Sequence, residues 1–235
     1  CIHIPFYNPE PEKPEGFRKL TRYDYLEENI NNLKGLSSQV DIFVHTHNNF
    51  LNNKDLSAKV IKHEIDKSDL GKGYLTWQTR KDMSQYLNSY NYFLYLEHDI
   101  KFTKSNFEYW KEYNNFFNKK KINLGFLIYE NNHEDNSKYS IHLSKKFDKI
   151  LKIDDQEFII NDIENYCCFW IYDQRTFSHF VKSKWWQLEN DLHNYRHKYG
   201  NTEKAAIGLH ALNINYFKGT LIPLINGKID PRCFI

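Results

Sequence analysis

Cysteine is scarce in this sequence, with four residues among 235. Cys167 and Cys168 are adjacent, while Cys1 and Cys233 stand near the two ends of the chain. Because no pair has CxxC spacing, the arrangement predicts neither a zinc site nor a disulfide framework. We expect reduced, buried thiols, and these favour a cytoplasmic location.

Charge of one sign and long apolar runs are scarce as well. The formal net charge of +2 argues against a nucleic-acid partner that is bound through a strong basic field. No apolar run approaches the roughly 18–20 residues that a transmembrane helix needs, so no transmembrane segment is expected. No signal peptide is visible, and the chain begins at Cys1 rather than Met, so we expect a piece of a longer protein.

The usual motifs of several enzyme classes are missing too. The sequence contains no GxSxG, no P-loop and no GxGxxG, so acyl transfer, P-loop hydrolysis and Rossmann dinucleotide binding lack their ordinary marks. What is present is 17% aromatic residues with an ordinary 26% charged residues. This composition permits a sizeable core and makes disorder unexpected.

Apolar patterning predicts alternating strands and helices. The sequence therefore favours one α/β domain, a Rossmann-like fold with a mixed central sheet flanked by helices, in which the first strands form a right-handed β-α-β unit. Strands are expected at 2–7, 40–44, 58–63, 92–96, 123–130, 167–172 and 221–224, with short antiparallel strands within 140–165. Helices are expected at 23–36, 75–90, 105–117 (capped by Ser105), 177–185 and 203–212 (capped by Thr202).

The most informative stretch is the apolar run from Tyr92 to Leu96, which stops at Glu97, His98 and Asp99. A continuous short apolar run is typical of a strand buried on both faces. Carboxylates at the carboxyl end of such a strand lie where α/β sheets hold ligands. Two neighbouring carboxylates repel each other unless a cation or a donor compensates them, which indicates a metal and phosphate site. The alternative is a solvated acidic turn.

Polar and aromatic side chains follow two other predicted strands, at residues 5–8 and 45–48. Strand ends in an open α/β sheet face one crevice, and this set of groups suits a nucleotide diphosphate with Mn²⁺ or Mg²⁺. Arg80 could give bidentate contact to a phosphate. The expected nucleotide-sugar ligands are Pro5, Tyr7, Thr46, Asn48, Arg80, Glu97 and His98.

A zinc hydrolase site is an alternative use of the same region. Its ligands would be His45, His47, His98 and Asp99, although no HExxH-type helix supports it. A lone histidine is more often a satisfied polar group than a ligand.

Several segments together resemble the GT-A-fold glycosyltransferases. The segments are Tyr74–Arg80, Tyr92–Ile100 and Asn106–Trp110, then Gly125–Glu130, Trp170 and Glu203–Gly208. They are similar, in order and spacing, to a group with LTW-x-H-[RK], a strand ending in Glu-Asp-Asp and a Tyr-Trp helix. The resemblance spans most of residues 2–224 and implies a single domain over 1–235. Its nucleotide-binding half is 1–130 and its acceptor-side half is 131–235.

The resemblance also implies roles for single residues. Asp99 ligates the metal, Glu97 supports the sugar, the nucleotide or the metal, and His98 touches the ribose. His98 departs from the family, which usually has Asp there, so the donor preference is expected to differ. Such folds often supply a further His ligand near the carboxyl end; here we expect that ligand to lie outside this sequence or to be replaced by water.

The activity implied is transfer of a hexosyl group from a UDP- or GDP-sugar to a glycan, glycolipid or glycoprotein hydroxyl, with inversion favoured. Inversion requires a carboxylate base. Glu203 is the first candidate, Glu130 the second and Asp162 the third, although Glu203 in a first helical turn also suits the helix dipole. Trp170 is expected to stack on the acceptor sugar or to pack in the core. A non-catalytic carbohydrate-binding domain and a metal-dependent hydrolase are the alternative functions.

Overall fold

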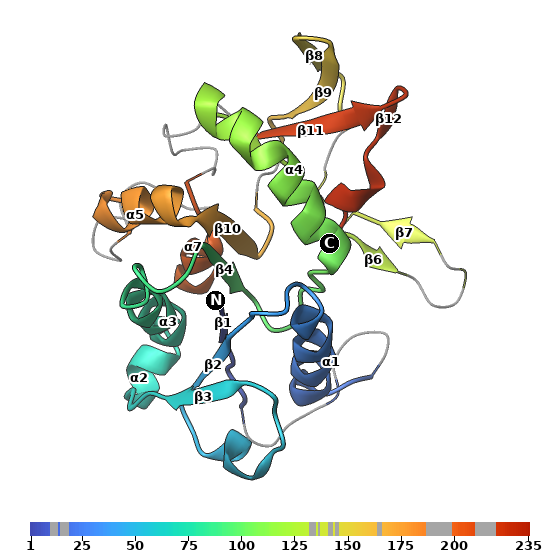
Figure 1. Cartoon of the computed structure of the whole chain (residues 1–235). Coiled ribbons are helices and arrows are strands. Elements are labelled where there is room, and N and C mark those ends of the chain that lie inside the picture. Colours follow the sequence, from blue (N-terminus) through green and yellow to red (C-terminus); the bar gives the residue numbers. More distant parts are fainter. Residues whose placement is uncertain are drawn as a thin grey trace. The chain divides into compact units, whose positions relative to one another are not determined.

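The computed structural model of this chain forms two units that interleave along the sequence (Figure 1). The first unit holds residues 1–101 and 168–208, and the second holds 102–167 and 209–235. The chain therefore leaves the first unit and later returns to it. The structure describes residues 1–9, 14, 19–131, 135, 137–140, 143, 146–163, 166–186, 199–209 and 220–235.

A five-stranded mixed sheet organises the first unit, in the order β10-β4-β1-β2-β3. Strands β1 to β4 are parallel to one another, and β10 runs antiparallel to β4. The predicted mixed α/β sheet and its parallel β-α-β start are confirmed. The strands are β1 (Ile2–Pro5), β2 (Ile42–Thr46), β3 (Lys59–Lys62), β4 (Tyr92–Leu96) and β10 (Phe169–Asp173).

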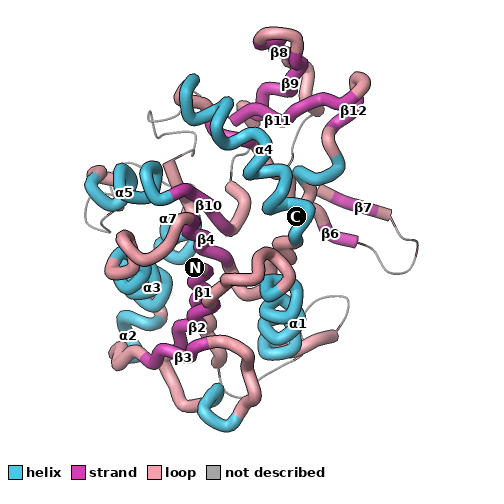
Figure 2. The backbone as a smooth tube through the Cα atoms, in the orientation of Figure 1, coloured by secondary structure: helices cyan, strands magenta, loops and turns pink. Residues whose placement is uncertain are grey.

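Helices cover both faces of this sheet, with α1 on one side and α2 and α3 on the other (Figures 1 and 2). Helix α1 begins after Thr21, which forms a capping box with Asp24, and its C-cap is Gly35, so its bounds lie close to the predicted range 23–36. The helical elements of the unit are α1 (Arg22–Lys34), η1 (Phe50–Asn53), α2 (Lys67–Leu70), α3 (Tyr74–Ser84), α5 (Gln174–Lys182) and α7 (Asn201–Ala206).

Aromatic packing on β4 explains why this strand is apolar without interruption. Phe93 and Tyr95 are fully buried. Phe93 stacks on Phe177 of α5 at a centroid distance of 4.2 Å, and Tyr95 stacks on Trp170 of β10 at 5.5 Å. Because β4 is an inner strand with packing on its faces, an apolar residue is favoured at nearly every position.

The second unit combines one long helix with a smaller sheet in the order β12-β11-β9-β8, and β5 also pairs with β11. A separate hairpin joins β6 and β7. Antiparallel strands within 140–165 are thus confirmed for β8 and β9. The elements are α4 (Lys104–Lys120), β5 (Asn123–Leu124), β6 (Glu130–Asn131), β7 (Lys138–Tyr139), β8 (Ile150–Ile153), β9 (Gln156–Asn161), β11 (Thr220–Ile225), β12 (Lys228–Ile229) and η2 (Pro231–Cys233).

Several predicted boundaries were wrong. Helix α4 begins after Thr103 and not at Ser105. Helix α7 begins after Gly200 and not at Thr202, and it ends at Ala206, six residues before the expected end at 212. Helix α3 ends at Ser84, six residues before the expected end, and is followed by turns. The strand expected at 123–130 is interrupted, because only its first two residues and its last residue are in strands.

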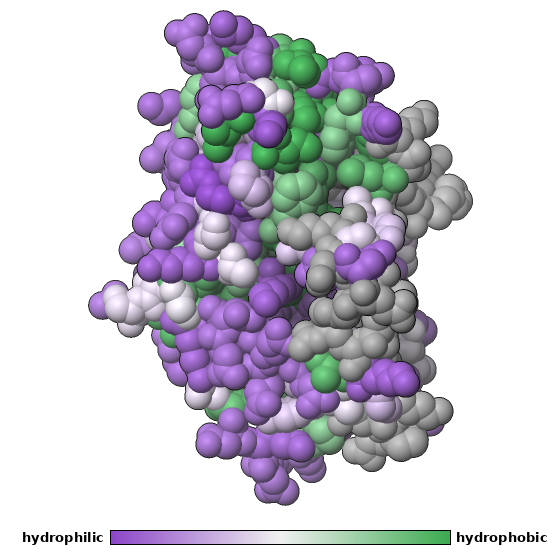
Figure 3. Space-filling model, turned by 90° about the vertical axis from the view of Figure 1, so that its right-hand side faces the viewer, coloured by the Kyte–Doolittle hydropathy of each residue, from purple (hydrophilic) through white to green (hydrophobic). Residues whose placement is uncertain are grey.

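Some apolar side chains remain exposed on β8 and β11 of the second unit, among them Ile150, Leu151 and Ile225. In the view of Figure 3, hydrophobic residues gather near the top of the described surface, and hydrophilic residues cover most of the remainder. None of the helices that the structure describes combines the length and the apolar character needed to cross a membrane.

Candidate functional site

The first unit has a topological switch point between β1 and β4. From β1 the chain moves to β2 and β3 on one side, and it then returns to place β4 on the other side of β1. Open α/β sheets bind ligands outside the carboxyl ends of the strands at such a point, because the two connections diverge there and leave a crevice. The loops that follow β1 and β4 are therefore the first place to seek a ligand site.

Contacts join these two loops. The rings of Phe6, after β1, and His98, after β4, meet edge to face with centroids 5.6 Å apart. Asn29 of α1 donates a hydrogen bond from Nδ2 to the carbonyl of His98 at 3.3 Å. Glu97 and His98 are partly exposed, and Asp99 is exposed. The acidic triplet is thus a turn at the predicted end of β4, and the structure sets it beside the loop after β1.

An aromatic pair lies at the ends of β1 and β2. Tyr7, which is 41% exposed, stacks on His47 with centroids 5.1 Å apart. Arg22, the first residue of α1, donates from Nη1 to the Tyr7 carbonyl at 3.2 Å and lies 5.8 Å from the Tyr7 ring. Tyr7 and His47 therefore form a stacked ring platform with a cation beside it.

Amide and hydroxyl groups connect the same two loops. Asn48 donates from Nδ2 to the Asn8 carbonyl at 3.3 Å, and Thr46 Oγ1 lies 3.4 Å from Asn48 Oδ1. Pro5 ends β1 and pairs in register with His45. The Asn8 side chain is 1% exposed, and neither of its amide atoms has a hydrogen-bond partner among the described residues.

Sequence reasoning placed Asn8 in the strand-end loop at 5–8 without giving it a role, and it missed Arg22 and Asn29. Asn8 lies directly after Tyr7, and its position at a strand end was the available signal. Arg22 and Asn29 belong to α1, so only the packing of that helix against the loops brings them to the site.

The structure places Arg80 in an aromatic box formed by Trp77, Phe180 and Trp186. The guanidinium carbon lies 4.4, 4.9 and 4.6 Å from these three ring centroids, respectively. Arg80 is 1% exposed, and its Nη2 donates to the carbonyls of Trp185 at 2.9 Å and Trp186 at 3.0 Å. The guanidinium charge is therefore in contact with carbonyl groups and aromatic rings of the protein. The phosphate contact expected of Arg80 stays a prediction.

Trp170 lies within the aromatic core, where it is 1% exposed. Its ring stacks between Tyr95 and Tyr172, at 5.5 and 5.3 Å, and its Nε1 donates to the Ala205 carbonyl at 3.2 Å. These contacts match the core role, which was the alternative to stacking on an acceptor sugar.

Glu203 lies in the first turn of α7, as expected. The Glu203 carboxylate folds back over Gly200. The approach is so close that a Cβ added at Gly200 would lie 2.5 Å from Glu203 Oε2. The position suits the positive end of the helix dipole. The other two candidate bases belong to the second unit: Glu130 is exposed on β6, and Asp162 follows β9 and pairs with Lys149.

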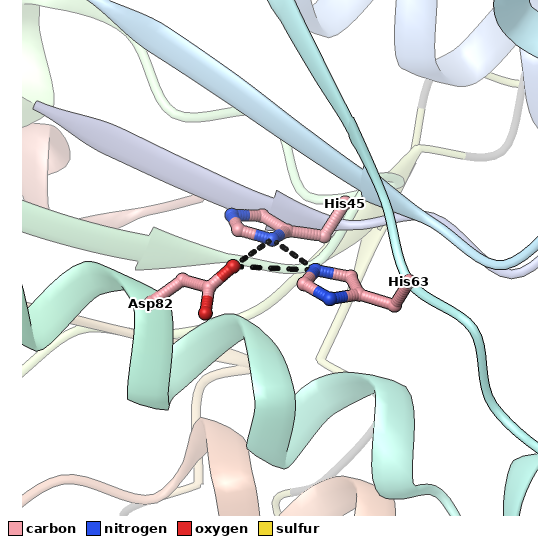
Figure 4. Close-up of side chains that lie close together, drawn as sticks. All are labelled: His45, His63 and Asp82. Atoms are coloured by element: carbon pink, nitrogen blue, oxygen red, sulfur yellow. Dashed lines mark hydrogen bonds and ion pairs between the residues drawn. The ribbon is translucent and has the colours of Figure 1, made fainter.

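A cluster of three histidines and one carboxylate lies on the α3 side of the first sheet. His3 Nδ1 is 2.9 Å from His45 Nε2, and His45 Nδ1 is 2.8 Å from His63 Nε2. Asp82 Oδ2 lies 3.8 Å from that His45 nitrogen and 3.5 Å from that His63 nitrogen. Figure 4 shows His45, His63 and Asp82 converging from β2, the end of β3 and α3.

Parallel register explains the cluster. His3 pairs with Phe43 and His45 with Ile61, so residues at the same parity on β1, β2 and β3 share one face. His63 lies two residues beyond Ile61 and therefore returns to that face. Asp82 is held in place by Gln78, one helical turn earlier, which donates from Nε2 to Asp82 Oδ1 at 3.1 Å.

Burial keeps these imidazoles neutral. Burial, together with a smaller effect of the nearby His63, lowers the pKa of His45 from 6.5 to about 3. Burial also lowers the pKa of His3 well below its ordinary value, and His45 adds to that effect. The pKa of His63 is lowered by burial and raised in part by Asp82. The three rings therefore carry lone pairs at neutral pH.

Among the described residues, His45, His63 and Asp82 are the one set of three or more His, Cys, Asp or Glu side chains close enough to share an ion. The zinc site expected from the sequence grouped His45 with His47, His98 and Asp99. In the structure, His45 is instead grouped with His63 and Asp82. Of the cluster, sequence reasoning had singled out His45 alone.

A cavity of about 790 Å³ lies beside this cluster. Gln78 and Glu64, the neighbours of Asp82 and His63, contribute to its wall, together with Tyr74, Trp77 and Trp186. The wall thus combines aromatic faces with polar groups.

Comparison of the chain with models of protein families and with curated proteins finds no match.

Proposed function

We propose that this chain is a divalent-metal-dependent glycosyltransferase, which moves a sugar from a nucleotide diphosphate sugar to an acceptor hydroxyl. The observation that carries the proposal is the position of Glu97, His98 and Asp99. They follow β4 at the switch point of a mostly parallel sheet, where ligands of open α/β sheets bind.

Asp99 is the proposed ligand of Mn²⁺ or Mg²⁺. Its carboxylate is exposed, and such ions are commonly held by one or two carboxylates together with substrate phosphates. The hydrogen bond from Asn29 to the His98 carbonyl fixes the turn that carries Asp99. When bound, the ion would neutralise charge that develops on the leaving diphosphate. Glu97 supports the ion or the sugar, and His98 contacts the ribose in this arrangement.

The ring platform of Tyr7 and His47 is the proposed seat of the nucleobase. Stacking on an aromatic side chain contributes about 1–3 kcal/mol per base, and Tyr7 has the exposed area to provide it. The buried amide of Asn8 is suited to the edge of the base, because it has no partner among the described residues. Arg22 is the cation best placed for a phosphate at this edge.

Glu203 is the proposed base, with Glu130 and Asp162 as the further candidates. Trp77 of α3 donates from Nε1 to the Asn201 carbonyl at 2.9 Å, which fixes the first turn of α7 against α3. Trp170 of β10 donates from Nε1 to the Ala205 carbonyl of α7 and stacks on Tyr95, two residues before Glu97. These contacts tie the helix of Glu203 to the strand of the acidic triplet. An acceptor hydroxyl on a glycan, glycolipid or glycoprotein would lose its proton to this carboxylate.

The test is release of UDP or GDP from nucleotide sugars in the presence of Mn²⁺. Replacement of Asp99 by Asn removes one negative charge with little change in shape, and we expect a loss of at least about 100-fold in rate, as for other preorganised charge contacts. Asp155→Asn, at an exposed acid in the turn between β8 and β9 that pairs with Lys152, is the matched control and should keep full activity.

Calorimetry with UDP and GDP separates the proposal from the alternatives. A glycosyltransferase should bind a nucleotide only when Mn²⁺ or Mg²⁺ is present. Full activity in Asp99→Asn, or glycan binding without any nucleotide binding, would contradict the proposal.

A further inference from the structure

We propose that His45, His63 and Asp82 form a second metal site, which binds a transition-metal ion of the zinc class independently of the acidic triplet. The ligand atoms are His45 Nδ1, His63 Nε2 and Asp82 Oδ2, the three atoms joined by dashed lines in Figure 4. Two imidazoles and one carboxylate are a donor set used by zinc and by other first-row metals, whereas Mg²⁺ prefers oxygen ligands.

The three ligand atoms already have the spacing that a small ion requires. Their separations are 2.8, 3.8 and 3.5 Å, and the point equidistant from all three lies about 2.0 Å from each. Zinc bonds to imidazole nitrogen and carboxylate oxygen measure about 2.0–2.2 Å. An ion can therefore sit slightly outside the plane of the three atoms, with a further coordination position open to water or a ligand.

Outer hydrogen bonds orient two of the three ligands. His45 Nε2 meets His3 Nδ1 at 2.9 Å, so a proton on His45 Nε2 is donated to His3 and the lone pair of Nδ1 faces Asp82 and His63. Gln78 occupies Asp82 Oδ1 at 3.1 Å and leaves Oδ2 for the ion. Such partners fix the tautomer and the rotamer of a ligand and strengthen metal binding.

The contact between the two imidazoles has to be bridged by a positive centre. Two nitrogen lone pairs 2.8 Å apart repel each other, so either a proton or a metal ion lies between them. Without metal, a proton on His63 Nε2 serves as the bridge. When an ion binds, His63 carries its proton on Nδ1 instead, and no ring has to change its net charge.

An ion also has a route to the site. The side chains of His63 and Asp82 are 10% and 16% exposed, while His45 is fully buried. Gln78, which hydrogen-bonds Asp82, and Glu64, which follows His63, line the cavity described above. The site therefore has a buried inner ligand and two outer ligands that solvent can reach, a geometry that admits an ion without unfolding of the sheet.

The test uses the chain stripped of metal by a chelator and then titrated with Zn²⁺ and, separately, with Co²⁺. We expect calorimetry to give one Zn²⁺ equivalent, with a rise in melting temperature through linkage. Cobalt should give the visible absorption bands of a four-coordinate site with nitrogen ligands. His63→Gln and Asp82→Asn should each weaken Zn²⁺ binding by at least about tenfold, and Gln78→Met by about tenfold.

His179→Gln is the matched control, because His179 is an exposed histidine on α5 outside the cluster. Both ligand variants change partly exposed side chains, and circular dichroism verifies that they fold. Asp99→Asn should leave Zn²⁺ binding unchanged, so this site and the proposed catalytic site can fail separately. Absence of stoichiometric Zn²⁺ binding, or binding that survives both His63→Gln and Asp82→Asn in folded protein, would overturn the proposal.

Discussion

Replacing Arg80 by Met tests whether the buried guanidinium stabilises the first unit. The side chain makes two hydrogen bonds to the carbonyls of Trp185 and Trp186 and lies near three aromatic rings. Methionine fills much of the same volume but leaves both carbonyls without this donor. Each hydrogen bond that involves a charged group contributes about 1.5–3 kcal/mol, and each cation–π contact about 0.5–2 kcal/mol.

The opposing effect is the cost of burying a charge, which Met avoids. Replacing buried ions by apolar groups is sometimes neutral or stabilising. Here the carbonyls stay behind, and a buried acceptor that loses its partner costs about 1–3 kcal/mol. We therefore expect Arg80→Met to lower the free energy of unfolding by about 3 kcal/mol. Arg80→Lys keeps the charge but lacks the planar fork, so it should lose about half as much.

Urea unfolding followed by tryptophan fluorescence measures both variants against the original chain. The slope of the free energy with urea should stay constant, so that the shift in midpoint reports stability alone. A loss below about 1 kcal/mol in Arg80→Met would refute the reasoning, because the rings and carbonyls would then be satisfied as well by an apolar neighbour.

Two further predictions concern helix starts. Hydrogen bonds from the Thr21 side chain and backbone lower the pKa of Asp24 below 3.8, so the charged capping box stabilises the fold above that pH and is lost as the pH falls through the folded-state value. Thr21→Ala should therefore cost about 1 kcal/mol at pH 6 and less at pH 2.5 in urea unfolding; equal costs would contradict the cap. Gly73 has φ +80, and a Cβ there would lie 2.6 Å from Thr202 Oγ1 and 3.0 Å from Thr202 N. Gly73→Ala should lower the melting midpoint by an amount equivalent to about 2 kcal/mol, whereas Gly71→Ala, whose nearest contact would be 3.7 Å, should change it little. Similar shifts for the two glycines would show that the close approach of Thr202 is unimportant.

The sheet of the first unit could be predicted because its strands are short apolar runs bounded by polar residues. The run at 92–96 and the polar stop at Glu97 are visible in the sequence, and the structure places β4 over those residues. The pairing order, and hence the contact between Phe6 and His98, depends on long-range packing that a local pattern does not contain.

The start of α4 shows why one boundary failed. Ser105 with Glu108 matches the capping-box pattern, yet the helix is capped by Thr103 with Asn106. The earlier start lets Asn106 donate from Nδ2 to the carbonyls of Arg232 at 2.7 Å and Phe234 at 2.8 Å. Those partners are more than a hundred residues away, so the sequence near the helix gives no signal for them.

The histidine cluster failed to emerge for a related reason. His3 and His45 lie on the same face of the sheet, but this can be deduced only when the register of β1 against β2 is known. Asp82 joins them through the rotation of α3 about its axis, which the broad apolar pattern of that helix does not determine.

The return of the chain to its first unit has a consequence for synthesis. Leu96 of β4 pairs with Phe169 of β10, so about seventy residues must be added before that pairing can begin. At about 5–20 residues per second, this interval lasts roughly 4–15 s. During this interval, one edge of β4 has unpaired backbone N–H and C=O groups next to apolar side chains. Such an exposed strand edge can pair with another chain. The nascent chain is therefore most exposed to aggregation between the synthesis of β4 and that of β10.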